Sequence, residues 1–173
     1  GLATGDYTVT YSYVNGACGT QSDESVIHVD APATVDAGTY AAVCNNSGLV
    51  ALSGTPAGGS FSGAQVAGSD FDPAGLATGD YTVTYSYVNG ACGTQSDLAV
   101  IHVDASATVD AGTYAAVCNT VGLVALSGTP AGGSFSGAQV AGSDFDATGL
   151  ATGDYTVTYS YVNGACGTQS DES

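Results

Sequence analysis

Hydrophobic and polar residues alternate strictly along residues 81–88, which read YTVTYSYV. The alternation places three tyrosines and Val83 on one face and the threonines and serine on the other. This two-residue period, with its aromatic and β-branched side chains, predicts a half-buried β-strand. The next two residues, Asn89 and Gly90, are the commonest signal for a two-residue hairpin turn. We therefore expect a partner strand over residues 94–103.

Shorter hydrophobic runs, separated by glycine and serine, predict further strands. We expect these at residues 113–117, 123–126, 132–137 and 143–146. No stretch of the chain shows a helical period. About seven short strands with turns every 8–12 residues predict an all-β fold made of immunoglobulin-like β-sandwiches.

The whole pattern repeats along the chain. Gly1, Gly75 and Gly149 begin successive copies, so the period is 74 residues. Residues 1–74 and 75–148 differ at only seven positions. A period of this length exceeds that of solenoid repeats, which run from about 20 to 50 residues, and matches a small autonomous domain. We therefore expect folded units arranged in series.

The boundary between units is predicted in the stretch VIHVDAPATVDAG, where a strand gives way to a short segment of Asp, Ala and Pro. On this basis, residues 1–30 are the C-terminal hairpin of an upstream unit. Residues 33–104 form a complete unit, and residues 107–173 form a unit that lacks the end of its last strand. The chain is expected to be a window on a longer array.

One tyrosine in each copy lies at the start of the penultimate strand, after a glycine turn and a leucine. This arrangement is typical of the tyrosine corner of immunoglobulin-like sandwiches, although an ordinary core tyrosine would give the same pattern. The candidates are Tyr7, Tyr81 and Tyr155.

Three longer segments carry a family resemblance: VDAGTYAAVC, LVALSGTPAGGSFSGAQV and FDPAGLATGDYTVTYSYVNGACGTQSD. Their order resembles the immunoglobulin-like and PKD-like repeats of large secreted surface proteins of Bacteroidota-type bacteria, over essentially the whole chain. Those repeats often carry a tryptophan where this chain has Phe61 and Phe135. The resemblance implies a module of an adhesin, a surface filament or a spacer, outside the cell, and it specifies no activity.

The charge of the chain restricts its partners. It has 16 acidic residues, no lysine and no arginine, and a net charge of −16. Nucleic-acid binding depends on basic residues that neutralise phosphates, so no nucleic-acid partner is expected. An anionic membrane surface would repel the chain, and no apolar run approaches the roughly 18 residues of a membrane span. The hydrophobic content of 44 % argues against disorder.

Single cysteines recur with the repeat, at Cys18, Cys44, Cys92, Cys118 and Cys166. Because there is no CxxC pair and no nearby histidine, disulfides are expected and zinc is not. One scheme pairs cysteines within a unit, as Cys44–Cys92 and Cys118–Cys166. A second scheme pairs Cys44 with Cys166 across a junction, because the two cysteines of one sandwich should lie at opposite poles. Both schemes stay open, as does bridging between chains.

Aspartates are candidates for calcium binding at the junctions. Three carboxylates that converge without a basic residue would suit Ca²⁺, which takes about 6–8 oxygen ligands; hydrated turn aspartates are the alternative. The candidate ligands are Asp80, Asp104 and Asp110 and, one period earlier, Asp6, Asp30 and Asp36. His28 and His102 are expected to be packed or edge residues of a terminal strand.

Together, these features predict a structural extracellular filament or stalk of serial units, stiffened by disulfides and by calcium if it binds. Its partners would be copies of itself in a fibre or in a longer chain of identical repeats. The alternative is an adhesin whose repeats bind glycans or a host or cell surface. An enzyme is not expected, because a unit this small offers little room for a cleft around paired carboxylates such as Asp70 and Asp72.

Overall fold

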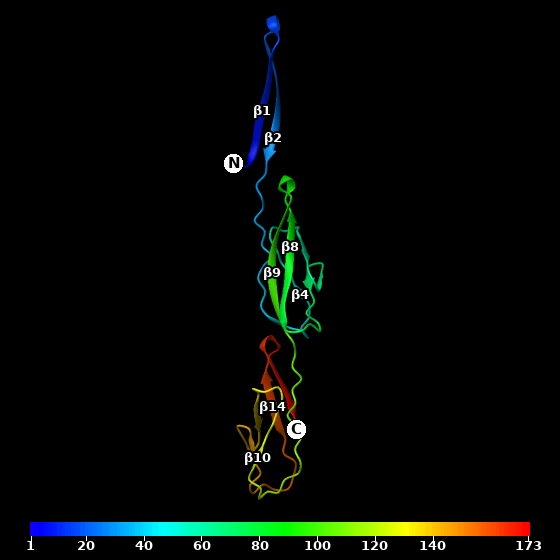
Figure 1. The fold of residues 1–173 in the computed structure, drawn as a ribbon, viewed down its shortest axis with the longest axis vertical. Helices are drawn as coiled ribbons and strands as arrows, with labels where there is room; N and C mark the ends of the chain where they lie inside the picture. Colours follow the sequence, from blue (N-terminus) through cyan, green and yellow to red (C-terminus); the bar gives the residue numbers. More distant parts are fainter.

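The computed structural model describes all 173 residues as an all-β protein with several sheets. Its only helices are three single turns of 3-10 helix, so it contains no helix that could cross a membrane. The molecule is elongated, with an N-terminal hairpin followed by two larger units in line (Figure 1). Residues 1–30, 33–104 and 107–173 are called the first, second and third units below.

The first unit is a two-stranded hairpin. Strand β1 (Gly5–Val14) pairs antiparallel with β2 (Thr20–Val29), and the 3-10 turn η1 (Gly16–Cys18) closes the tip. No second sheet covers the hairpin, so apolar side chains such as Val26 and Ile27 are exposed.

The second unit has two sheets. A four-stranded sheet has the order β3 (Val43–Cys44), β9 (Thr94–Asp104), β8 (Gly79–Val88) and β5 (Ser60–Ser62). A three-stranded sheet has the order β4 (Val50–Ala51), β7 (Asp70–Phe71) and β6 (Val66–Ala67). Strand β9 has β8 antiparallel on one side and β3 parallel on the other.

The core of the second unit draws on both sheets. Phe71 from β7 and Val83, Ile101 and Val103 from β8 and β9 are all fully buried in one cluster. Burying each such side chain stabilises the fold by about 1.5–3 kcal/mol. The predicted alternation of β8 is confirmed, because Val83 and Tyr85 are buried while Thr82 is exposed.

The third unit repeats this arrangement with fewer paired residues. One sheet has the order β10 (Leu123–Ala125), β13 (Asp144–Asp146) and β12 (Val140–Ala141). The other has the order β11 (Ser134–Gly137), β14 (Val157–Val162) and β15 (Thr168–Glu172). The turn η3 (Gly164–Cys166) joins β14 to β15.

Two local predictions are wrong. Residues 113–117 form no strand, and in the second unit only the last residue of the matching stretch, Val43, pairs with β9. The Asn89-Gly90 pair does not form a two-residue turn either. Val88 pairs with Thr94, and the loop between them contains the 3-10 turn η2 (Gly90–Cys92). The loop needs positive φ at its two glycines, and it places a cysteine at the tip of each hairpin.

Candidate functional site at the junction between repeats

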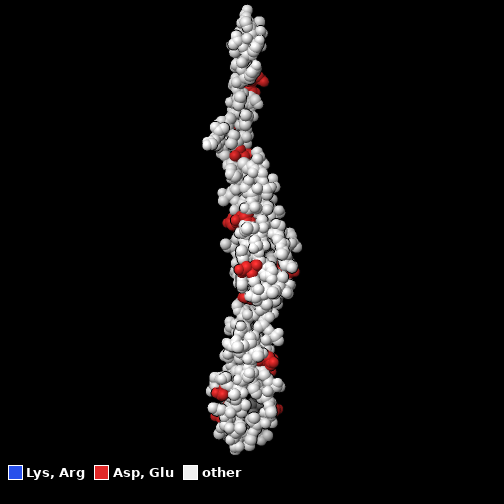
Figure 2. Space-filling model, in the orientation of Figure 1, with Lys and Arg blue, Asp and Glu red and all other residues white.

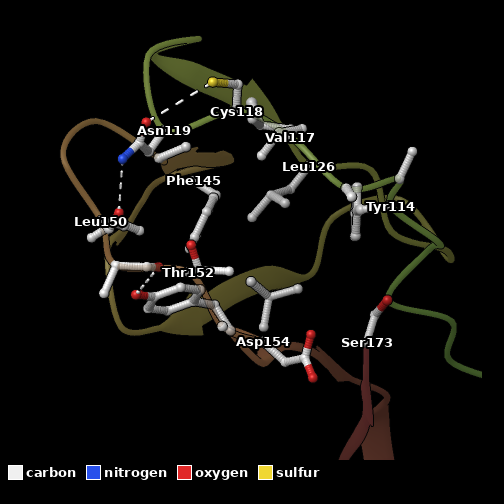
Figure 3. A pocket seen from close by; sticks show the side chains of 18 residues that line it. Tyr114, Val117, Cys118, Asn119, Leu126, Phe145, Leu150, Thr152, Asp154 and Ser173 are labelled. Carbon is white, nitrogen blue, oxygen red and sulfur yellow. Dashed lines mark hydrogen bonds between the residues drawn. The ribbon is translucent and has the colours of Figure 1, made fainter.

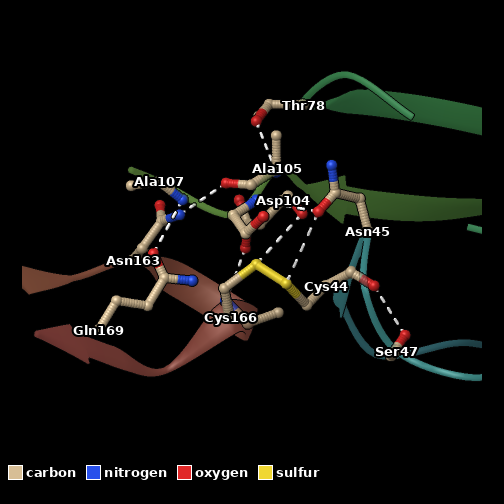
Figure 4. The surroundings of a disulfide bond; sticks show 12 residues. Cys44, Asn45, Ser47, Thr78, Asp104, Ala105, Ala107, Asn163, Cys166 and Gln169 are labelled. Carbon is tan, nitrogen blue, oxygen red and sulfur yellow. Dashed lines mark hydrogen bonds between the residues drawn. A yellow bond between two sulfur atoms is a disulfide. The ribbon is translucent and has the colours of Figure 1, made fainter. Parts of the chain in front are cut away.

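The hairpin tip of the third unit meets the end of the second unit where β3 and β9 both finish (Figure 4). Strand β3 ends at Cys44 and β9 ends at Asp104, and these two residues are paired neighbours in the parallel ladder. The approaching tip is η3, which carries Cys166. The sheet therefore presents the sulfur of Cys44 and the carboxylate of Asp104 side by side to the next unit.

A disulfide crosses this junction. It joins Cys44 to Cys166, which lie 122 residues apart in the sequence with their Cα atoms 4.6 Å apart. That separation lies within the normal range of about 4.4–6.8 Å. The structure therefore contains the junction pairing and neither of the pairings within a unit. Cys18, Cys92 and Cys118 are free thiols.

Three polar contacts hold the tip and the linker between the units together. The Asn163 side-chain amide donates to the Ala105 carbonyl at 2.6 Å, and the Ala165 N–H donates to the Asp104 carboxylate at 2.7 Å. The Ala107 N–H donates to Gln169 Oε1 at 2.8 Å. The linker is therefore fixed on both sides of the disulfide.

The junction between the first and second units repeats two of these contacts one period earlier. The Asn89 side-chain amide donates to the Ala31 carbonyl at 2.6 Å, and the Ala91 N–H donates to the Asp30 carboxylate at 3.4 Å. The third contact is missing, and the Gln95 Oε1 atom that would accept it is buried without a partner. No counterpart of Cys44 lies one period earlier within residues 1–173, and Cys92 is a free thiol. The tip-to-end contact is thus a property of the repeat and not of one place in the chain.

Asp104 links the junction to a histidine as well as to the tip. His102 Nδ1 lies 2.6 Å from Asp80 Oδ1, and His102 Nε2 lies 3.4 Å from Asp104 Oδ1. The hydrogen bond with Asp80 raises the pKa of His102, and the two negative charges act in the same direction. His28 makes the same contacts with Asp6 and Asp30 in the first unit, and its pKa is also raised.

The aspartates do not gather as a calcium site would require. Asp80 and Asp104 bracket an imidazole ring, and Asp6 and Asp30 do the same. The third candidates turn back on their own backbones: the Gly112 N–H donates to Asp110 at 2.7 Å, and the Gly38 N–H donates to Asp36 at 2.8 Å. No group of three or more His, Cys, Asp or Glu residues could hold a metal ion.

The candidate corner tyrosines all make the same contact. The hydroxyl groups of Tyr7, Tyr81 and Tyr155 each donate to a backbone carbonyl four residues upstream, at 2.8–3.0 Å. A tyrosine corner is defined by this bond. It fixes the turn that leads into the hairpin strand, and therefore the direction in which the hairpin leaves the unit.

Asn45 is a junction residue that sequence reasoning missed. Its N–H donates to the Asp104 carbonyl at 2.8 Å, its side-chain amide donates to the Leu76 carbonyl at 2.8 Å, and its Oδ1 accepts from the Ser106 N–H at 2.9 Å. The available signal was the Cys-Asn pair, which both copies keep although the next two residues change.

The surface electrostatics are of one sign. Acidic side chains are scattered along the molecule, and the chain has no basic side chain to pair with them (Figure 2). No protein-family model matches the chain, and a search of curated proteins finds no match.

Proposed function

We propose that the chain is part of an extracellular stalk or filament built from immunoglobulin-like sandwiches in series. The observation that carries this proposal is the Cys44–Cys166 bond between adjacent units, set among polar contacts that recur at both junctions. A repeat that carries its own coupling at each end can be extended without new surfaces. The suggestion that the chain comes from a large bacterial surface protein rests on the resemblance of its repeats alone.

The mechanism is mechanical. Two covalent connections join the second and third units, the backbone at residues 105–106 and the disulfide. Two connections restrict hinge bending far more than one. The long strands β8 and β9 lie along the molecular axis (Figure 1). The backbone of residues 33–44 and the disulfide form a continuous covalent path to the next unit, so part of an axial pull bypasses the hydrogen-bond ladders. These features suit a rigid spacer under tension.

The composition fits the same role. A net charge of −16 with no basic residue keeps neighbouring chains apart by mutual repulsion. The absence of lysine and arginine also removes every cleavage site for trypsin-like proteases. Both properties are useful to a stalk exposed outside a cell.

The side chains that an adhesin would offer to a ligand are used for packing. In the second unit, Phe71 and Tyr85 are buried, and the Tyr85 hydroxyl donates to the Pro56 carbonyl at 2.6 Å. Their burial favours the structural role over glycan binding.

Electron microscopy of a longer chain of these repeats tests the proposal. The ten residues of β8 span about 34 Å, so straight rods with an axial period somewhat above that value are expected. Reduction should broaden the distribution of angles between units without unfolding them. Particles with freely varying angles before reduction would contradict the proposed function.

A further inference from the structure

Each hairpin tip carries an Asn-Gly pair, at residues 15–16, 89–90 and 163–164. The pair does not form the two-residue turn that it usually signals, so its presence in all three tips needs another reason. Asparagine followed by glycine is also the pair most prone to spontaneous deamidation, because glycine has no side chain to shield its backbone nitrogen. The tips are therefore chemically labile as well as structural.

The junction uses both residues of the pair. The Asn163 side-chain amide donates to the Ala105 carbonyl of the linker at 2.6 Å (Figure 4). Gly164 has a positive φ of 45°, and a Cβ atom there would overlap with the Asp104 carboxylate. The glycine that permits this close approach is thus the same one that leaves the asparagine unshielded, and a larger residue could not replace it without loss of the contact.

Deamidation would begin when the backbone nitrogen of Gly164 attacks Cγ of Asn163. The new N–Cγ bond closes a succinimide ring, the Cγ–Nδ2 bond breaks, and Nδ2 leaves as ammonia with the proton of the Gly164 N–H. Water then adds to either ring carbonyl and opens the ring, which leaves aspartate or isoaspartate. The reaction consumes water and releases ammonia, with no change of oxidation state.

The docked tip opposes ring closure. The ψ angle of Asn163 is 78°, so the Gly164 nitrogen lies on the opposite side of the Cα–C bond from Cβ. The peptide between the two residues must therefore turn over before the nitrogen can reach Cγ. That rotation would move Gly164 out of its contact with Asp104, and the side chain would have to leave the Ala105 carbonyl.

The tip of the first unit offers a matched comparison within the same chain. Its loop is closed by the Asn15 N–H, which donates to the Gly19 carbonyl at 2.9 Å, as the Asn163 N–H does to the Gly167 carbonyl at 2.9 Å. Asn15 itself is exposed, and its side chain caps nothing. A difference in reactivity between the tips therefore reports the junction contacts and not the loop.

We propose that the Asn-Gly pair of each tip is a site of spontaneous deamidation that docking protects, and that a tip deamidated before docking no longer forms the junction. An aspartate at position 163 would replace the amide donor with a carboxylate oxygen that faces the Ala105 carbonyl, and it would add a negative charge beside Asp104. Isoaspartate would lengthen the backbone next to Cys166. The proposal rests on the contact between units and stands whether or not the repeats form a stalk.

The first test incubates the oxidised 173-residue chain at mildly alkaline pH and follows deamidation by mass spectrometry after digestion with chymotrypsin, because the three tip peptides end differently. We expect Asn89 to react roughly three- to tenfold more slowly than Asn15, the factor for one hydrogen bond that must break. Asn163 should react more slowly still, because the disulfide opposes opening of its junction. Reduction should speed the reaction at Asn163 and leave Asn15 unchanged.

Two outcomes would overturn the first part of the proposal. Equal rates at Asn15, Asn89 and Asn163 would mean that docking gives no protection. An unmodified Asn15, after a time in which the free peptide VNGACGTQ is fully converted, would mean that the tip loop is not a modification site.

The second test fixes the product with Asn163→Asp and measures the fraction of the Cys44–Cys166 bond in a glutathione redox buffer. We expect an equilibrium constant for the disulfide at least about fivefold lower than in the unchanged chain, because a donor is lost and a carboxylate faces a carbonyl. The matched control is Asn46→Asp, which adds the same charge at an exposed position of the second unit. Equal disulfide formation in the two variants would overturn the exclusion of deamidated tips.

Discussion

Removing the junction disulfide should uncouple the second and third units. The perturbation is the double variant Cys44→Ser/Cys166→Ser, which leaves no new thiol to pair with Cys92 or Cys118. The chain-entropy relation for a closed loop of 122 residues gives about 4.9 kcal/mol. If the second unit stays folded, only about 60 residues of the loop are flexible, and the same relation gives about 4.3 kcal/mol.

Measured effects fall below these values when the unfolded chain retains structure, so we expect a loss of about 2–4 kcal/mol for the third unit. Urea unfolding followed by tyrosine fluorescence is a suitable assay, because the chain has eleven tyrosines and no tryptophan. With slopes of about 1–3 kcal/mol/M, the midpoint should fall by roughly 0.7–4 M. The matched control is Cys18→Ser/Cys118→Ser, which removes two exposed free thiols and should leave the midpoint unchanged.

Two results would refute this reasoning. A midpoint shift in the junction variant as small as that in the control would mean that the disulfide does not couple folded units. An equally large shift in the control would mean that Cys18 or Cys118 makes a structural bond that the single chain does not contain.

Three further predictions concern the core, the histidine pair and metal. Phe71→Ala should lower the free energy of unfolding of the second unit by about 3–5 kcal/mol. Phe145→Ala should lower that of the third unit by less, because Phe145 lines an open apolar pocket (Figure 3) and is already partly exposed. Paired urea titrations compare the two losses. His102→Gln should lower stability at pH 5.5 and have no effect near pH 9. The pKa of His102 is raised in the folded state, so the stability that its protonated form contributes is complete below the unfolded value of about 6.5 and is lost as the pH rises through the folded value. A loss of stability in the variant that grew with pH would refute this. Melting temperatures should be the same in Ca²⁺ and in EGTA, because the carboxylates flank histidines or close their own turns; a calcium-dependent rise would restore the metal site.

The strand pattern could be predicted because each long strand is encoded locally. The alternation of Val83 and Tyr85 with threonine and serine is set by the two-residue period of a strand, and the structure buries those two side chains. The hairpin tip was mispredicted for a physical reason. Asn-Gly favours a two-residue turn, but a second glycine at Gly93 allows a longer loop with a 3-10 turn.

The junction could be predicted only in part. Counting strands placed Cys44 and Cys92 at opposite poles of one unit, which favoured pairing across a junction but left the pairing within a unit open. Only the three-dimensional contact between units distinguishes the two pairings. The calcium prediction grouped aspartates by pole and ignored His102, whose ring occupies the space between Asp80 and Asp104. Sequence position alone does not show which neighbour a carboxylate faces.

Disulfide mapping without reduction tests the head-to-tail junction most directly. Trypsin cannot cut the chain, and the segment from Asp80 to Ser96 recurs without change at residues 154–170, so cleavage at aspartate cannot tell the two tips apart. Chymotrypsin, which cuts after aromatic residues and leucine, gives distinct peptides at the two tips. We predict a linked pair of AAVCNNSGL, residues 41–49, with VNGACGTQSDES, residues 162–173. A linked pair of AAVCNNSGL with VNGACGTQSDL, residues 88–98, would contradict the account.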